Sequence, residues 1–315
     1  MFDVITLGSA VIDFFLATGV HERRHEICYP AGTKIAVKDL RYSTGGGGTN
    51  TSVSFSRLGL KTAWLGKIGT DVNSEVILKE MKKEKVTFLG SKCEDKTGIS
   101  VILDSEEHER TVLTYKGAND DMKFSEVKLN KLKTKWFYFA SMMGESFKTQ
   151  EKLAEFASKK GIKIAYNPSS YQTKQGAEAL KNVLKNTEVL ILNKEEAQML
   201  SGSGDFLKKL RELGPNIVCV TNGKEETVVY DGKHKYSANP HDFTGKERTG
   251  AGDAFASTLV AGIIKGESME LCLQLATTNS ESVIKYYGAK NILLTWKAAL
   301  KELRKNPVKV TKEVY

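Results

Sequence analysis

The sequence predicts an α/β fold with a mostly parallel central sheet, helices on both faces and a small separate β-sheet. Short apolar segments alternate with amphipathic ones over most of the chain, which is the pattern of a parallel sheet covered by helices. Two β-rich stretches, residues 10–43 and 97–115, interrupt this alternation. No segment rich in Pro, Gly or Ser divides the 315 residues, so we expect one domain over residues 1–315.

The N-terminal half supplies the first strands, two helices and both β-rich stretches. In chain order we expect a strand, a helix, a strand, a helix and a hairpin over residues 2–7, 49–58, 62–68, 71–84 and 97–115. The hairpin follows from alternating apolar and polar residues on both sides of an acidic turn. We expect 10–43 and 97–115 to form the small sheet together, as a lid at one edge of the main domain.

The C-terminal half repeats strand–helix units. Strands are expected over residues 136–140, 163–167, 189–192 and 217–221, and helices over 149–159, 174–185 and 194–200. A hairpin to residue 236 follows the last of these strands. The longest apolar helices then cover residues 254–264 and 269–286, and a basic tail, 301–315, closes the chain.

Composition narrows the class of protein. Apolar residues make up 40% and charged residues 27%, which is typical of a globular chain. The net charge of +9 is spread over lysine-rich segments without interleaved aromatics, which favours a solvated surface over a nucleic-acid partner. No apolar run approaches the roughly 18 residues that span a membrane, so no membrane partner is expected. The four cysteines lack metal-binding spacing, which favours a reduced, cytoplasmic setting.

The turn Thr249-Gly250-Ala251-Gly252-Asp253 is the most informative stretch. Small residues let backbone N–H groups approach an anion, and the apolar helix that follows adds the positive end of its dipole. A carboxylate at Asp253 is placed to accept a proton beside that anion. The alternative is an aspartate that only complements the helix dipole.

Two further motifs favour small-molecule binding in the N-terminal half. Four consecutive glycines, Gly45 to Gly48, precede Thr49 and Asn50, and allow close approach of a ligand to the backbone. They are neither a Walker loop nor a G-x-G-x-x-G turn. Asp13 is an acid in an apolar stretch that would accept two sugar hydroxyls. A connecting glycine loop and a solvent-facing aspartate are the alternatives.

Polar residues also end two predicted strands in the C-terminal half. Asn193 and Glu196 supply oxygen ligands that suit a hydrated Mg²⁺, although the same spacing is that of a helix capping box. Thr221 and Gly223 form a polar turn that suits phosphate or ribose.

In this order, the motifs resemble the ribokinase (PfkB) family of carbohydrate and nucleoside kinases, over nearly the whole chain. The N-terminal pattern is carried by Gly48-Thr49-Asn50-Thr51-Ser52, Gly59 and Gly69, and the C-terminal one by Gly250-Ala251-Gly252-Asp253. Asn193 with Glu196 matches the family's N-x-x-E, and Gly117-Ala118-Asn119 is also typical. The resemblance implies a ribokinase-like three-layer sandwich with a small β lid.

The resemblance also implies roles for these residues. Asp253 would be the general base, and the amides of Gly250, Ala251 and Gly252 the anion hole. Asn193 and Glu196 would hold Mg²⁺ through water. The nucleotide would lie against Asn193, Thr221 and Gly223, with Asn279 near the adenine. The sugar would be bound by Asp13, Gly45, Gly46 and Asn50. Positioning and water exclusion suit phosphoryl transfer, which needs little covalent chemistry.

The expected activity is therefore transfer of the γ-phosphoryl of ATP to a hydroxymethyl group of a small sugar or polyol. The resemblance also leaves open the formation of a homodimer through the lid. Glu247 and Arg248 stand where relatives usually have Asp-Thr in a loop that binds a monovalent cation, so we expect weak or no activation by potassium. Val11 stands where ribokinases proper carry asparagine, which argues against ribose.

Three other functions are weighed. A nucleoside kinase would need an apolar base pocket, which Phe14, Phe15 and Tyr29 are able to supply. A catalytically silent sugar- or nucleotide-binding regulator conflicts with the intact Asp253, Asn193 and Glu196. A Rossmann dehydrogenase conflicts with the missing G-x-G-x-x-G.

Overall fold

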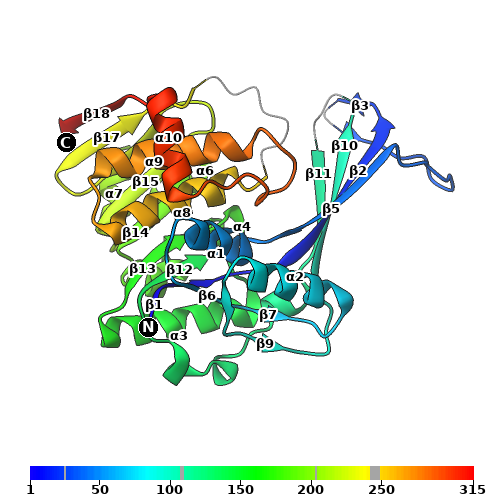
Figure 1. Ribbon diagram of the computed structural model, residues 1–315, viewed down its shortest axis with the longest axis horizontal. Helices are drawn as coiled ribbons and strands as arrows, with labels where there is room; N and C mark the ends of the chain where they lie inside the picture. The colour runs from blue at the N-terminus through cyan, green and yellow to red at the C-terminus, as the bar shows by residue number, and fades with distance from the viewer. Residues whose placement is uncertain (25, 107–109, 203, 242–248) are drawn as a thin grey trace.

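The central sheet of the computed structural model contains strands from both halves of the chain (Figure 1). Residues 1–24, 26–106, 110–202, 204–241 and 249–315 are described. The strands are β1 (Phe2–Leu7), β6 (Thr62–Leu65), β8 (Thr87–Phe88), β12 (Thr134–Ala140), β13 (Lys163–Asn167), β14 (Val189–Asn193), β15 (Ile217–Thr221), β16 (Thr227–Tyr230), β17 (His234–Ala238) and β18 (Val310–Val314). Their order is β18-β17-β16-β15-β14-β13-β12-β1-β6-β8. Neighbours from β8 to β15 run parallel and those from β15 to β18 antiparallel.

Helices cover both faces of this sheet, because side chains along each strand alternate between the faces. On β1, Ile5 and Leu7 join one core cluster and Val4 joins the other. The first cluster lies under α3 (Gly144–Lys160), α5 (Ala177–Leu184), α6 (Lys194–Ser201) and α7 (Phe206–Glu212), and the second under α1 (Gly47–Arg57), α8 (Ala251–Lys265), α9 (Met269–Val283) and α10 (Trp296–Lys305). The predicted α/β architecture with a mostly parallel sheet is confirmed.

A second sheet stands off the edge of the first, at the right of Figure 1. Its strands are β2 (Val11–Val20), β5 (Asp39–Gly45), β10 (Gly98–Ser105) and β11 (Arg110–Tyr115), in the order β11-β10-β2-β5. They come from the two stretches that break the strand–helix alternation. The remaining elements are short strands, two helices and three turns of 3₁₀ helix: β3 (Glu22–Arg23), β4 (Glu26–Ile27), β7 (Lys67–Ile68), β9 (Ser91–Lys92), α2 (Val72–Lys83), α4 (Ser170–Thr173), η1 (Gly117–Asp120), η2 (Phe124–Glu126) and η3 (Leu129–Lys131).

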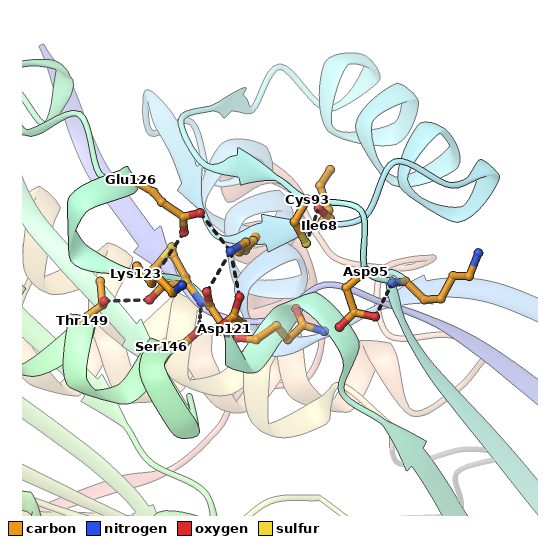
Figure 2. A network of polar contacts seen from close by, with 12 residues as sticks. Ile68, Cys93, Asp95, Asp121, Lys123, Glu126, Ser146 and Thr149 are labelled. Atoms are coloured by element: carbon orange, nitrogen blue, oxygen red, sulfur yellow. Dashed lines mark hydrogen bonds and ion pairs between the residues drawn. The ribbon is translucent and has the colours of Figure 1, made fainter.

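A buried lysine, Lys67, holds the segment that follows the second sheet against the main domain. Lys67 is 3% exposed, and its Nζ donates to the Asp121 carbonyl (2.9 Å), the Asp121 carboxylate (3.1 Å) and Glu126 Oε1 (2.9 Å). Figure 2 shows Asp121 and Glu126 in this network, in which Glu126 also accepts from the backbone N–H of Lys123. Burial alone would lower the pKa of Lys67, but its hydrogen bonds to Glu126 and Asp121 outweigh burial and raise it.

The C-terminal segment is more ordered than a basic tail. Residues 301–305 complete α10, whose apolar side packs on the second core cluster through Trp296 and Leu303. β18 then pairs antiparallel with β17 and covers that edge of the sheet. Among the described residues, no helix combines the length and the apolar character that a bilayer crossing requires.

Candidate active site

The candidate site lies beside β1, where the parallel sheet continues in sequence on both sides. From β1 the chain adds β6 and β8 on one side, and β12 to β15 on the other. Ligands of open α/β sheets bind at the carboxyl ends of the strands at such a switch point. A cavity of about 400 Å³ opens there, and its lining includes Asp253, Asn193, Glu196 and Thr221. The tertiary structure thus brings together predicted residues that are far apart in the chain.

The turn at residues 249–253 begins α8 at Ala251, three residues earlier than the predicted start at residue 254. Gly250 precedes the helix with φ +84°, a left-handed conformation that glycine adopts without strain. A Cβ on Gly250 would lie 2.3 Å from that of Ala289, so a larger residue would also collide. Within the described part of the chain no side chain caps α8, which leaves the N–H groups of its first turn available to an anion.

Asp253 lies in this first turn and is held by a residue from α1. Asn50 Nδ2 donates to Asp253 Oδ2 at 2.8 Å. The two helices approach closely because small residues face each other, with Ser257 Oγ 2.6 Å from Ser54 Oγ. Burial raises the pKa of Asp253, and the Asn50 hydrogen bond and the charge of Lys290 oppose that rise. This arrangement suits a carboxylate that accepts a proton.

The glycines at positions 45–48 allow this segment to pack directly against the backbone that follows β1. A Cβ on Gly48 would lie 2.4 Å from the carbonyl oxygen of Gly8, at the end of β1. A Cβ on Gly45 would lie 1.9 Å from Asp13 Oδ2, and one on Gly46 would lie 2.5 Å from the Ser9 carbonyl oxygen. Gly45 and Gly46 are thus required by packing within the protein, and Gly47 is the member of the run that lines the cavity.

Asp13 is buried, with 6% of the residue exposed, which excludes a solvent-facing strand residue. Strand register places it in one row across the second sheet with Ser43, Ser100 and Thr114, all on the same face. Burial raises the pKa of Asp13 to about 6; the Ser100 hydrogen bond and the Lys290 charge lower it, and the charge of Asp253 raises it.

Two buried polar atoms near this row have no protein partner among the described residues: Ser43 Oγ and Asn50 Oδ1. Buried polar atoms are normally hydrogen-bonded, so these two unpaired atoms point to a ligand that supplies the missing partners. Together with the Asp13 carboxylate they offer mainly acceptors. The arrangement suits a ligand that carries several hydroxyl groups.

Asn193 and Glu196 form the capping box of α6 and also line the cavity. Asn193 Oδ1 accepts from the Glu196 N–H at 2.8 Å, and Glu196 Oε2 accepts from the Asn193 N–H at 3.0 Å. Burial raises the pKa of Glu196, against the hydrogen bond from Asn193. Among the described residues no group of three His, Cys, Asp or Glu is placed to enclose a metal ion. The pair therefore suits Mg²⁺ that keeps its waters and is carried by phosphates.

A second cavity of about 220 Å³ adjoins the first, since both are lined by Thr221 and Gly252. Gly223 lies on its wall, and its other lining includes Phe255, Thr277, Ser280 and Ile284. Asn279 does not line it. Its side chain is fully buried, donates to Thr258 Oγ1 at 2.8 Å and accepts from the Leu294 N–H at 2.9 Å. Thr277 and Ser280 face the cavity in its place.

Some residues of the site have no recognisable signal in the sequence. Lys290, Ser43 and Ser280 carry no motif, although the Gly288-Ala289 pair marks the loop of Lys290 and strand pairing places Ser43 opposite Asp13. Asn119 joins the site indirectly, because its side chain accepts from the Ala10 N–H and donates to the Ala10 carbonyl, both at 2.9 Å. The predicted effect of Glu247 and Arg248 lies outside the described residues.

The family model for pfkB family carbohydrate kinases matches residues 1–296. An uncharacterized sugar kinase from Archaeoglobus fulgidus is 28% identical over 248 residues, covering 76% of this chain and 97% of its own. A cytidine kinase from Thermococcus kodakarensis is 24% identical, covering 91% and 98%. The fold is similar to that of a ribokinase from Arabidopsis thaliana solved with ribose and ATP, with a TM-score of 0.84, 19% identity and coverage of 96% and 99%.

Proposed function

Since this chain belongs to the pfkB family of carbohydrate kinases, we propose that it transfers the γ-phosphoryl of ATP to a hydroxymethyl group of a small sugar or polyol. Phosphotransfer to an alcohol is the activity of the family. The choice of acceptor rests on one observation: the Asp13 carboxylate and the unpaired Asn50 Oδ1 and Ser43 Oγ lie near the base and call for a ligand with several hydroxyls.

Each group of residues has its own role in the proposed transfer. Asp253 accepts the proton of the attacked hydroxyl, while Asn50 orients its carboxylate. The amides that begin α8, at Ala251 and Gly252 after the Gly250 turn, stabilise the transferring phosphoryl. Thr221 and Gly223 contact the nucleotide, and the adenine lies in the smaller cavity. The second sheet acts as a lid over the acceptor, which excludes water.

Glu196 is the carboxylate that would hold the waters of a nucleotide-bound Mg²⁺, which would supply neutralisation of phosphate charge. We expect Glu196→Gln to raise the Mg²⁺ concentration for half-maximal rate by about tenfold or more, and to change the acceptor KM less. Glutamine still closes the capping box, so stability should be kept. Rates measured across a Mg²⁺ titration, with Glu195→Gln as control, decide this. An unchanged Mg²⁺ requirement would favour a capping role only.

A nucleoside is the second candidate acceptor. Phe15 and Arg41 are paired on neighbouring strands, on the same face of the second sheet as Asp13. The Phe15 ring packs edge-on against Tyr287, with ring centroids 6.5 Å apart, and the Arg41 guanidinium lies 4.2 Å from the centroid of the same tyrosine ring. A nucleobase would find an aromatic surface there. Phe14 lies on the opposite face of the sheet, against Tyr42, so it is not part of this surface.

A coupled ADP-release screen tests the proposal. The purified protein is assayed with ATP and Mg²⁺ against pentoses, hexoses, polyols, keto-acids and nucleosides. We expect turnover with a sugar or polyol and loss of that turnover in Asp253→Asn. Turnover confined to nucleosides would replace the proposed acceptor by the second candidate. Acceptor-independent ATP binding without turnover would favour a non-catalytic regulator.

Potassium is expected to have little effect on the rate. An arginine at position 248, in the loop before the catalytic turn, would repel a monovalent cation and act as a fixed charge. The measurement is initial rates in sodium, potassium and large organic-cation buffers at matched ionic strength. A several-fold increase specific to potassium would contradict the expectation and show that Glu247 maintains the cation site.

A further inference from the structure

Among the residues that the structure describes, the larger cavity is lined by three carboxylates, those of Asp120, Glu196 and Asp253, and by one basic side chain, Lys116. The phosphate chain of a nucleotide carries several negative charges, which the carboxylates would repel. The first-turn amides of α8 supply only about half an elementary charge. The glycines at positions 45–48 add no charge. A nucleotide in this cavity therefore finds one cationic side chain on the described lining.

The ammonium of Lys116 is not neutralised within the described part of the chain. It forms no ion pair there, and its Nζ lies 4.9 Å from the centroid of the Tyr171 ring, which also lines the cavity. An aromatic face attracts a cation without removing its charge. The buried Lys290 differs, because its Nζ pairs with Glu80 at 2.9 Å. The N–H donors of Lys116 are therefore available to an anion.

The backbone of Lys116 is fixed by the turn that follows it. Its carbonyl accepts from the Asn119 side chain at 2.9 Å and from the Asn119 N–H at 3.2 Å. The same side chain also pairs with the backbone of Ala10. Gly117 has φ +51°, and a Cβ on it would lie 2.2 Å from the Lys96 carbonyl oxygen, so no larger residue fits. Buried contacts thus set the point from which the Lys116 side chain reaches the cavity.

The two cavities indicate which part of a nucleotide Lys116 would contact. They share Thr221 and Gly252, but Lys116 and Asp253 line only the larger one. The transferred phosphoryl has to lie in the cavity that holds the base. With the adenine in the smaller cavity, the β- and γ-phosphates therefore extend into the larger one.

We propose that Lys116 is the side chain that contacts the β- and γ-phosphates of the bound nucleotide. The proposal rests on the proposed function, which places the adenine in the smaller cavity and the base in the larger one. A positive charge at these phosphates favours nucleotide binding and stabilises the charge that the leaving β-phosphate gains during transfer. Tyr171 holds the ammonium at the cavity wall through its aromatic face.

The test measures nucleotide affinity by calorimetry, in Mg²⁺ buffer without an acceptor. The probes are the non-hydrolysable β,γ-imido analogue of ATP, ADP and AMP. Lys116→Met should weaken binding of the imido analogue by about tenfold or more, because hydrogen bonds to charged groups contribute by that order. ADP should lose less affinity, and AMP, which lacks both contacted phosphates, should bind as it does to the wild type. Lys116→Arg keeps the charge and should restore most of the affinity.

Lys265→Met is the matched control. Lys265 Nζ lies 5.0 Å from the centroid of the Trp296 ring, and the residue lines neither of the two cavities. This variant removes the same charge from the same kind of aromatic contact. It should leave all three affinities unchanged.

Wild-type affinity for the imido analogue in Lys116→Met would overturn the proposal. An equal loss for all three probes would also overturn it, since that result indicates general damage to the site. So would a higher KM for an acidic acceptor with nucleotide affinity kept, which would assign the ammonium to the acceptor. If Lys116→Met does not fold, Lys116→Gln is measured in its place.

Failure of the proposed function gives a different result. A wild-type protein that binds none of the three nucleotides would overturn the proposed function, and the role of Lys116 with it. Wild-type binding that Lys116→Met leaves unchanged would overturn only the role of Lys116. Because no acceptor is present, the series is independent of which sugar or nucleoside the enzyme uses.

Discussion

Replacing Asp253 by asparagine is expected to lower kcat by about 10²–10⁴-fold while ATP binding persists, because a positioned general base contributes a factor of that order. The side chain keeps its size at the start of α8, and the Gly250–Gly252 turn, which we propose contacts phosphate, is unchanged. Steady-state rates with the acceptor identified in the screen, together with nucleotide affinity from calorimetry, give the two quantities. A variant that keeps a third of the wild-type kcat would remove Asp253 from the role of base.

Glu270→Gln is the matched control for this variant. Glu270 is also an acid in the first turn of a helix, α9, and pairs with Lys312 at 3.4 Å. If Asp253 only complemented a helix dipole, both variants would lose a little stability and neither would lose activity. A large loss of kcat confined to Asp253→Asn distinguishes catalysis from helix stabilisation.

Replacing Asp13 by asparagine is expected to raise the acceptor KM and to lower kcat/KM by about 10²-fold. A hydrogen bond to a charged group contributes about 1.5–3 kcal/mol, and the carboxylate would accept from two hydroxyls. The KM for ATP should stay close to its wild-type value, because Asp13 lies in the second sheet and does not line the smaller cavity, where we propose that the adenine binds. Initial rates over a matrix of both substrates separate the two effects.

Asp39→Asn is the control for Asp13→Asn. Asp39 lies on the same face of the same sheet, but its side chain is half exposed and pairs with Arg41. It should leave both KM values nearly unchanged. A KM for the acceptor that rises equally in the two variants would indicate a general weakening of the sheet and contradict a direct role for Asp13.

Local chemistry was sufficient to select residues that the structure brings together around one cavity. The turn at residues 249–253 was selected because small residues before an apolar helix leave backbone amides open, wherever the helix later packs. Asn193 and Glu196 were selected because Asn193 ends a predicted strand and Glu196 lies one helical turn further on. For that pair the sequence left two interpretations open, and the structure contains the capping box within the lining of the cavity. Both uses of the side chains are therefore compatible.

Position in the assembled fold decided the rest. Asn279 looked available for a nucleotide, but α8 and the segment after α9 enclose it, and its amide satisfies their polar groups. Ser43 could be placed beside Asp13 only from the strand register, because the partner strand determines which side chains share a row.

By itself the sequence determined the alternation of strands and helices in the main domain, the two stretches that form the second sheet, and the turn that carries Asp253, because glycine placement and apolar periodicity are local properties. Only the tertiary structure decided that Lys290, one lysine among many in a basic chain, is buried and pairs with Glu80 at 2.9 Å. Burial and the neighbouring charges depend on which distant segments meet. These determine whether a lysine is a solvated surface charge or part of a site.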